Sequence, residues 1–286
     1  MKTDLRAAAP IDLPGLSARH RDIFHPSPHR RLTVVLVMTS ALALAIYAGV
    51  RLDFSFGRLG SGLVQLAHFL TLMIPPSPGT QLSSFLHALA ETLAIAFLGT
   101  LTAAIVAAPI GMLAARNIVA NPFAHFAVRR LLDTVRGVDV LIWALIFINV
   151  VGLGPFAGIL AIAVSDAGAF GKLFSEAIEA ADRGPVEGVL STGGGHAHVV
   201  RFALLPQVLP VIASQVLYYF ESNTRSATII GIVGAGGIGL HLSEQIRVLD
   251  WDKVAFLVLM ILATVSAIDF VSSRLRLAII GRSALA

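Results

Sequence analysis

The sequence predicts an all-α integral membrane protein with six transmembrane helices. Of the 286 residues, 56% are hydrophobic and 13% are charged, and the mean hydropathy is +0.82. Soluble domains carry about 25% charged residues, so the composition argues against a soluble globular fold. The apolar residues are gathered in runs long enough to cross a hydrocarbon core of ~30 Å, which takes about 20 residues of helix. The chain has no cysteine, which excludes disulfides, thiolate nucleophiles and cysteine-ligated metals.

Six apolar segments are expected to cross the membrane as helices. The two glycines and the proline within 152–155, between the segments 138–151 and 156–173, predict a tight helical hairpin. A further apolar segment, 63–74, is too short to span and is expected to lie at the membrane interface. The six predicted spans are 32–50, 85–115, 138–151, 156–173, 206–220 and 254–272.

The basic residues predict that both chain termini are cytoplasmic. Lys and Arg are retained on the cytoplasmic side of short loops. With the N-terminus inside, 16 of the 21 lysines and arginines fall on the cytoplasmic side. Arg225 lies within an apolar stretch, and the other four, Arg51, Arg58, Arg247 and Lys253, fall outside. The loop 172–205 is then the one substantial cytoplasmic loop.

This cytoplasmic loop is predicted to form a protruding helical knob. Residues 175–182 favour a helix, which Gly184 and Pro185 interrupt, because proline cannot continue a hydrogen-bonded helix but suits the first turn of a new one. A second helix is expected from 185 to about 191, ended by glycines at 193–195. A return helix is expected over 198–202, entering the membrane at Leu205 and Pro206.

The spacing within the loop resembles the signature loop of ABC-importer permeases. In that family a Glu-Ala-Ala element is followed six residues later by Gly and thirteen residues after that by a Leu-Pro. Glu187, Gly193 and Leu205-Pro206 stand at those spacings here. The departures are Gly188 and Val189 in place of the two alanines and Ala203 in place of a branched residue.

A second stretch, 220–239, is similar to the phosphonate-permease branch of these importers. Its sequence is FESNTRSATIIGIVGAGGIG, and residues 91–96 (ETLAIA) and 114–117 (AARN) are similar to that branch as well. The likeness covers roughly residues 85–275. It implies the type I ABC-importer permease architecture, in the inner membrane of a bacterial cell.

The resemblance also implies a domain organisation and a coupling site. A cytoplasmic tail over 1–31 and a transmembrane helix over 32–50 precede a periplasmic or interfacial segment over 51–84. The permease core then covers 85–275, with the coupling loop at 172–205 and a cytoplasmic tail over 276–286. In the family the short helix of the loop docks on a cytoplasmic ATPase, which implies that role for Pro185, Glu187, Gly188, Ser191, Gly193 and Gly194.

The implied function is that of a permease subunit of an ATP-driven importer for phosphonates or a related phosphorus oxyanion such as phosphite. The chain lacks a P-loop, so ATP and Mg belong to separate ATPase subunits, and no cofactor or metal is expected in this chain. Six spans are too few to form both halves of a two-lobed translocation path, which indicates that two copies of the chain form a homodimer around it. A periplasmic phosphonate-binding protein and the lipid bilayer are the other expected partners, and no nucleic acid is expected.

Two alternatives stay open. One is an ABC permease for methionine or another small solute, since the small-residue stretch after Ser226 is similar there too. The other is a secondary transporter driven by an ion gradient, with Glu91, Asp166 and Glu221 as coupling sites. An intramembrane enzyme is not expected, because the chain has neither HExxH nor a serine elbow.

The glycine-rich stretch matches GxGxxG at 234–239, but we do not expect a dinucleotide site there. Such a site needs a preceding strand and a βαβ unit, whereas this stretch lies between two membrane spans. Small residues instead allow close helix packing or broken backbone that lines a cavity. The candidates for a gate or close packing are Gly231, Gly234, Gly236, Gly237 and Gly239.

A group of polar residues follows the fifth span and is a candidate for the translocation pathway. Counted from Pro206 at 1.5 Å per residue, Glu221 lies about 22 Å and Arg225 about 28 Å along the helix, near the external mouth. The two residues are spaced for an i, i+4 ion pair, and Arg225 could instead donate to an oxyanion. The candidate pathway residues are Glu221, Asn223, Arg225, Ser226 and Thr228.

Overall fold

The computed structural model describes residues 28–52, 54–119 and 121–283. The chain divides into two units, one ending at Phe69 and one beginning at Leu70. In the first unit, α3 (Pro28–Arg51) contains an apolar stretch long enough to span a membrane. Helix α4 (Phe56–Leu72) starts seven residues before the predicted interfacial helix and ends two residues earlier. Most of the predicted N-terminal tail, residues 1–27, lies outside the described residues.

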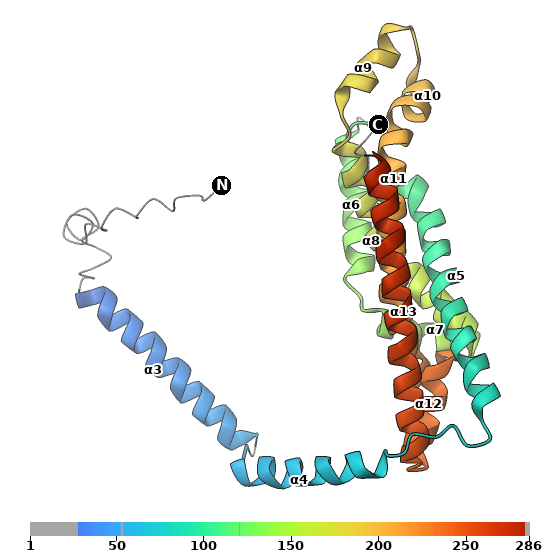
Figure 1. Ribbon diagram of the computed structural model, residues 1–286. Coiled ribbons are helices and arrows are strands. Elements are labelled where there is room, and N and C mark those ends of the chain that lie inside the picture. Colours follow the sequence, from blue (N-terminus) through green and yellow to red (C-terminus); the bar gives the residue numbers. More distant parts are fainter. Residues whose placement is uncertain (1–27, 53, 120, 284–286) are drawn as a thin grey trace, which may run out of the picture. The chain divides into compact units, whose positions relative to one another are not determined.

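The second unit is a helical bundle (Figure 1). Over the described residues it consists of helices joined by turns and short loops, without strands. Its elements are α5 (Leu82–Ala114), α6 (Pro122–Arg136), α7 (Val140–Val151), α8 (Pro155–Glu179), α9 (Arg183–Ser191), α10 (His196–His198), the π-helix η1 (Val199–Leu204), α11 (Leu205–Ile230), the π-helix η2 (Gly231–Ala235), α12 (Ile238–Arg247) and α13 (Trp251–Ser283).

Among the described residues, five helical segments are long and apolar enough to cross a membrane, or six if the bent pair α6 and α7 counts as one span. The prediction that residues 138–151 span alone is wrong. Helix α7 has 12 residues and is therefore ~18 Å long, shorter than the ~30 Å core. It follows α6 at a bend of 84°. The predicted hairpin between α7 and α8 is confirmed, with Gly152 and Gly154 at positive φ in its turn.

Several predicted boundaries differ from the helix ends. Helix α8 continues to Glu179, so the separate helix expected over 175–182 is its last part. Helix α11 continues to Ile230, ten residues past the predicted end of the fifth span. Helix α13 continues to Ser283, so residues 276–283 of the predicted tail are helical. In each case the helix extends beyond the apolar run. The predicted ends were based on the length of the apolar run, whereas the helix continues through polar residues.

Small residues let α5 and α8 approach closely, and this pair forms the most extensive helix contact. A Cβ on Gly99 of α5 would lie 2.7 Å from Ile162 of α8, and one on Gly111 would lie 2.8 Å from Phe174. Real Cβ atoms do not tolerate such distances, so glycine is required at both positions. Close approach through small residues is how helices associate in lipid, where the hydrophobic effect gives little driving force.

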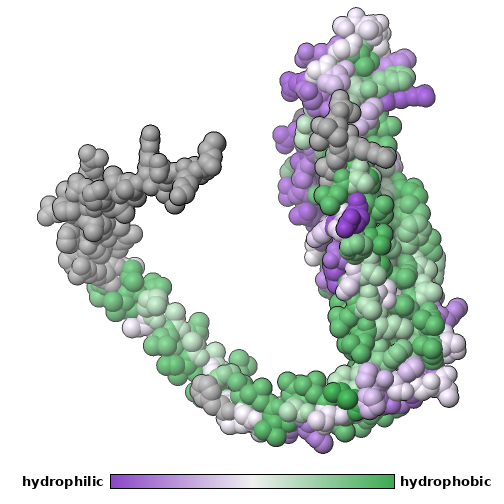
Figure 2. All heavy atoms as spheres, viewed as in Figure 1, coloured by the Kyte–Doolittle hydropathy of each residue, from purple (hydrophilic) through white to green (hydrophobic). Residues whose placement is uncertain are grey.

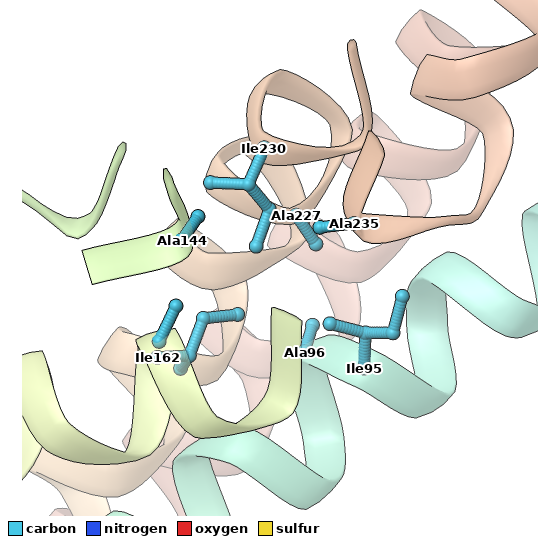
Figure 3. Close-up of a cluster of buried hydrophobic side chains, with 8 residues drawn as sticks. Ile95, Ala96, Ala144, Ile162, Ala227, Ile230 and Ala235 are labelled. Carbon is cyan, nitrogen blue, oxygen red and sulfur yellow. The ribbon is translucent and has the colours of Figure 1, made fainter. Parts of the chain in front are cut away.

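The main core cluster lies where α5, α7, α8, α11 and η2 meet (Figure 3). Ile95 and Ile162 are fully buried between alanines of neighbouring helices. The cluster consists of Ile95, Ala96, Ala144, Ala161, Ile162, Ala227, Ile230 and Ala235. It therefore fixes the last turns of α11 and the start of η2 against the rest of the bundle.

The surface of the second unit is apolar over its middle part. Figure 2 shows hydrophobic residues over α5 and hydrophilic residues gathered around α9. Phe97, Leu101 and Ile105 of α5 are all at least 40% exposed. An apolar surface of this extent is covered by lipid in a membrane protein and would aggregate in water. This distribution is that of a multi-pass membrane protein.

Candidate functional site

Helix α9 projects from one end of the bundle and is free of buried residues (Figure 1). Its N-cap is Asp182, whose carboxylate accepts a hydrogen bond from the N–H of Gly184 at 3.2 Å. The helix therefore begins two residues before the predicted start at Pro185, which lies in its first turn. Glu187, Gly188 and Ser191 are exposed along it. Four of the six predicted coupling residues thus lie on a short exposed helix, and Gly193 and Gly194 follow its end.

The glycines after α9 have conformational reasons to be glycine. Gly193 has a φ of +82°, in the left-handed region that favours glycine. A Cβ on Gly194 would lie 2.7 Å from Val189, and its N–H donates to the Val189 carbonyl at 3.1 Å. These two residues end α9 and return the chain toward the bundle.

The return path to the bundle is helical, as predicted, and contains a π-helical stretch. In η1 the N–H of Leu205 bonds to the carbonyl of Val200, five residues back. Pro206 follows directly and has no N–H to continue the α-helical pattern, which the wider turn accommodates. Gln207 of α11 accepts from the N–H of Asp182 at 2.9 Å. We call residues 182–204 the α9 arm. Its first residue is hydrogen-bonded to α11, and its last residue continues into α11.

At the other end of α11 the glycine-rich segment is broken backbone and also closely packed. Gly234, Gly236 and Gly237 have positive φ values of 109°, 83° and 72°. A Cβ on Gly231 would lie 2.5 Å from the carbonyl oxygen of Gly236, and one on Gly239 would collide with that of Thr228. Both proposed roles of this stretch, broken backbone and close packing, are therefore present in the structure.

Two side chains of α5 hold this broken segment. Glu91 Oε1 accepts from the N–H of Gly237 at 3.2 Å, and Thr92 Oγ1 accepts from the N–H of Ile238 at 2.8 Å. The first N–H groups of a helix have no partner within the helix, so these bonds satisfy the start of α12. Glu91 therefore has a structural partner in the broken segment.

Helix α11 carries a polar face along four turns. Ser214, Tyr218, Glu221 and Arg225 follow one another at i, i+4, i+7 and i+11, so they lie on one side. A neighbouring row consists of Gln215, Tyr219, Ser222 and Ser226. Of these eight residues only Glu221 is buried. Polar side chains on a membrane helix face protein or water-filled space, so this face is a candidate lining of a pathway.

Glu221 is held by two arginines. Arg276 of α13 donates from Nη2 to Glu221 Oε2 at 3.1 Å, while Arg225 Nη2 lies 3.6 Å from Glu221 Oε1. The Arg276 guanidinium also lies over the ring of Tyr218, 5.6 Å from its centre. The i, i+4 pair predicted between Glu221 and Arg225 is present, and Arg276 is the shorter contact.

Two of the predicted pathway residues face the bundle core. Asn223 Nδ2 donates to Thr100 of α5 at 2.8 Å and to the carboxylate of Asp166 of α8. Thr228 is buried, and its hydroxyl donates to the carbonyl of Thr224 at 3.2 Å. Asn223 therefore joins three helices, and Arg225 and Ser226 are the predicted pathway residues on the accessible side.

The contact with Arg276 places Glu221 relative to the two ends of α13. Arg276 lies 25 residues after Trp251 in α13, or ~37 Å along the helix, which exceeds the ~30 Å core. Glu221 therefore lies beside the last part of α13, far from the end at which that helix begins.

Sequence reasoning missed Ser214, Gln215, Tyr218 and Tyr219, and it assigned Arg276 to a tail. The first four residues lay within an apolar run, where the length of the run hid their helical spacing. That spacing, i and i+4 in two adjacent rows, is a signal that the sequence contained. The position of Arg276 beside Glu221 had no such signal, because it depends on how α11 and α13 pack.

Residues 107–282 match the model of the family described as binding-protein-dependent transport system inner membrane component. Two relatives from Stutzerimonas stutzeri carry names of phosphite transport system permeases. HtxC is 40% identical over 256 residues, covering 90% of this chain and 89% of that protein. PtxC is 36% identical over 247 residues, covering 86% and 89%.

The fold is also that of a solved importer. The chain is similar to a subunit in an inward-facing structure of the MetNI methionine ABC transporter, with a TM-score of 0.62 and 21% identity. The similarity covers 71% of this chain and 99% of that one, which shows a type I ABC-importer permease fold. The family match and the two relatives show that the chain belongs to the binding-protein-dependent transport system inner membrane component family, the permeases of ABC importers.

Proposed function

We propose that this permease conducts a phosphorus oxyanion, phosphite or a phosphonate, into the cell in an ATP-driven importer. The observation that carries the proposal is the identity of 40% and 36% to two permeases named for phosphite transport, along 90% and 86% of this chain. The arginines beside Glu221 support an anionic cargo, because guanidinium groups donate to phosphorus oxyanions.

The chain contributes the conduit and the coupling to ATP hydrolysis, which takes place on separate ATPase subunits. The exposed helix α9, with Glu187 on its surface, is the surface offered to the ATPase. Both termini and the α9 arm lie in the cytoplasm, as the distribution of basic residues predicts. Arg276 and Glu221 are then on the cytoplasmic side of the path.

A second copy of the chain completes the pathway, and a periplasmic binding protein delivers the anion. The described part of one copy has five or six helical segments that could span, and a pore along a two-fold axis between two copies gives the usual symmetric arrangement of a homodimer. In this arrangement the polar face of α11 lines the path, and the broken segment at Gly234–Gly237, held by Glu91 and Thr92, fixes one end of α11.

Methionine is the second candidate cargo, because the solved importer of the same fold is a methionine transporter. That similarity is at 21% identity, well below the identity to the phosphite permeases. Two arginines around one carboxylate also attract a zwitterion such as methionine less strongly than they attract an anion.

The proposal can be tested with the binding protein that co-purifies with this permease from its native membrane. That binding protein is isolated, and its affinity for candidate ligands is measured. Titration with phosphite, methylphosphonate and methionine is expected to give saturable binding of a phosphorus oxyanion and none of methionine. Saturable binding of methionine alone would contradict the proposed substrate class.

A further inference from the structure

A pocket of about 410 Å³ lies beside the ion pair of Glu221 and Arg276. Three elements form its wall, and most of the wall comes from the polar face of α11. The lining residues are Leu173 of α8, Ser214, Gln215, Tyr218 and Tyr219 of α11, and Arg276 of α13. Five of these six side chains can donate a hydrogen bond, which is the requirement for holding an oxyanion.

Arg276 has donors left after its contact with Glu221. A guanidinium has five N–H groups, and the bond to Glu221 is made by Nη2. The Arg276 side chain is 21% exposed while that of Glu221 is 9% exposed, and of the two only Arg276 lines the pocket. The ring of Tyr218 beneath the guanidinium fixes its plane.

Gln215, another residue that lines the pocket, has an unpaired hydrogen-bond acceptor. Its amide oxygen is buried and has no partner within the described structure. Buried polar atoms are nearly always paired, so an unpaired one calls for an explanation. Gln215 also lines the pocket, so a turn of its side chain would let this oxygen accept from the hydroxyl of a singly protonated phosphorus oxyanion whose other oxygens accept from Arg276.

The charges around the pocket favour an anion. Glu221 carries one negative charge against the two positive charges of Arg225 and Arg276, which leaves the group at +1. A second excess of positive charge lies on α6 and α8, where Lys172 directly precedes the pocket residue Leu173 in the chain. There Asp133 is within 4 Å of Lys172, Arg130 and Arg136. Attraction by such fields concentrates anions near the cationic surface.

We propose that this pocket holds the phosphorus oxyanion during its passage through the permease, with Arg276 as the principal donor. The inference rests on the proposed function and adds the place and the residues of binding. The competing explanation is that Arg276 only neutralises Glu221 and marks the cytoplasmic face, as basic residues at span ends do. The two explanations predict different results for the same set of variants.

The test measures ATP-dependent uptake of labelled phosphite by the complete importer, permease with its ATPase and binding protein, in proteoliposomes. Arg276→Gln is expected to lower uptake by about tenfold or more, since a charge-assisted hydrogen bond is worth ~1.5–3 kcal/mol. Tyr218→Phe keeps the ring under the arginine and removes the hydroxyl, and a smaller loss is expected. Arg274→Gln is the matched control, because Arg274 is exposed and lies over Phe270, away from the pocket lining.

The double variant Glu221→Gln with Arg276→Gln separates the explanations, because it removes both charges of the pair. The pocket proposal predicts that its uptake stays as low as that of Arg276→Gln at equal abundance in the membrane. Recovery of uptake in the double variant, or unchanged uptake in Arg276→Gln, would overturn the pocket. If the wild-type importer took up methionine and no phosphorus oxyanion, the proposed function itself would fail, whatever the variants do.

Discussion

Arg276 of α13 donates to Glu221 of α11 at 3.1 Å, a shorter contact than the 3.6 Å between Arg225 and the same carboxylate. The pair joins two helices that are 55 residues apart in the chain. Because Arg276 also pairs with Glu221, loss of Arg225 does not leave the Glu221 carboxylate without a cationic partner. A buried charge that loses its only partner costs several kcal/mol, and this cost does not arise for Arg225 variants.

The first prediction concerns Arg225, whose side chain is 50% exposed on the polar face of α11. Arg225→Gln is expected to leave the permease folded and abundant, because Arg276 still pairs with Glu221, and to lower phosphite uptake. Arg225→Lys should retain part of the uptake, because the charge stays while the planar fork of donors is lost. Uptake per molecule of inserted permease is the measurement.

A double variant, Glu221→Gln with Arg225→Gln, serves as the comparison for Arg225. It leaves Arg276 without its carboxylate, so it is not expected to restore uptake. Full recovery in this double variant would contradict a contact between Arg225 and the anion, and it would show that Arg225 serves only to balance Glu221.

The second prediction concerns the coupling helix α9. Glu187→Lys is expected to leave the permease inserted and to reduce ATP-dependent uptake strongly, because a cation replaces an anion on the exposed helix offered to the ATPase. Glu176→Lys, a charge reversal at an exposed position of α8, is the control. Uptake equal to that of the wild type in Glu187→Lys would remove the coupling role from this helix.

The third prediction concerns the hydrogen bond from Ile238 N–H to Thr92 Oγ1 at 2.8 Å. Thr92→Val has nearly the same shape but leaves a buried N–H unpaired, which costs ~1–3 kcal/mol. Thermal unfolding in detergent should therefore show a lower midpoint for Thr92→Val and a nearly wild-type midpoint for Thr92→Ser. Thr102→Val, at an exposed position of the same helix, is the control, and an equal loss there would show that the bond is unimportant.

The fourth prediction concerns orientation. The chain has no cysteine, so Ser191→Cys on α9 introduces a single thiol at an exposed site. An impermeant maleimide is expected to label it in inverted membrane vesicles and not in intact cells with a permeable outer membrane. Labelling from the periplasmic side would contradict a cytoplasmic α9 arm and the orientation that the basic residues predict.

The sequence was sufficient for the fold class, the hairpin at Gly152–Gly154 and the exposed α9 arm. Each of these depends on local features, namely apolar length, glycine and proline positions and charge distribution. The broken backbone at Gly234–Gly237 was also open to prediction, because glycine clusters in a membrane segment have few other uses. The side chains that hold it, Glu91 and Thr92, lie 146 positions away, and local patterns do not reveal such partners.

The third span and the site around Arg276 were beyond the sequence analysis for two different reasons. The bend of 84° between α6 and α7 leaves an apolar helix of 12 residues after an amphipathic one, and a search for apolar runs does not detect such a bend. The contact of Arg276 with Glu221 depends on the register between α11 and α13, which only tertiary packing fixes.

The most direct test of the account is uptake by the complete importer reconstituted in proteoliposomes, with labelled phosphite, methylphosphonate and methionine offered in turn. The account predicts uptake of a phosphorus oxyanion that requires ATP, the ATPase subunits and the binding protein, with no uptake of methionine. Uptake of methionine alone, or uptake of the anion without ATP that follows an imposed pH gradient, would contradict it.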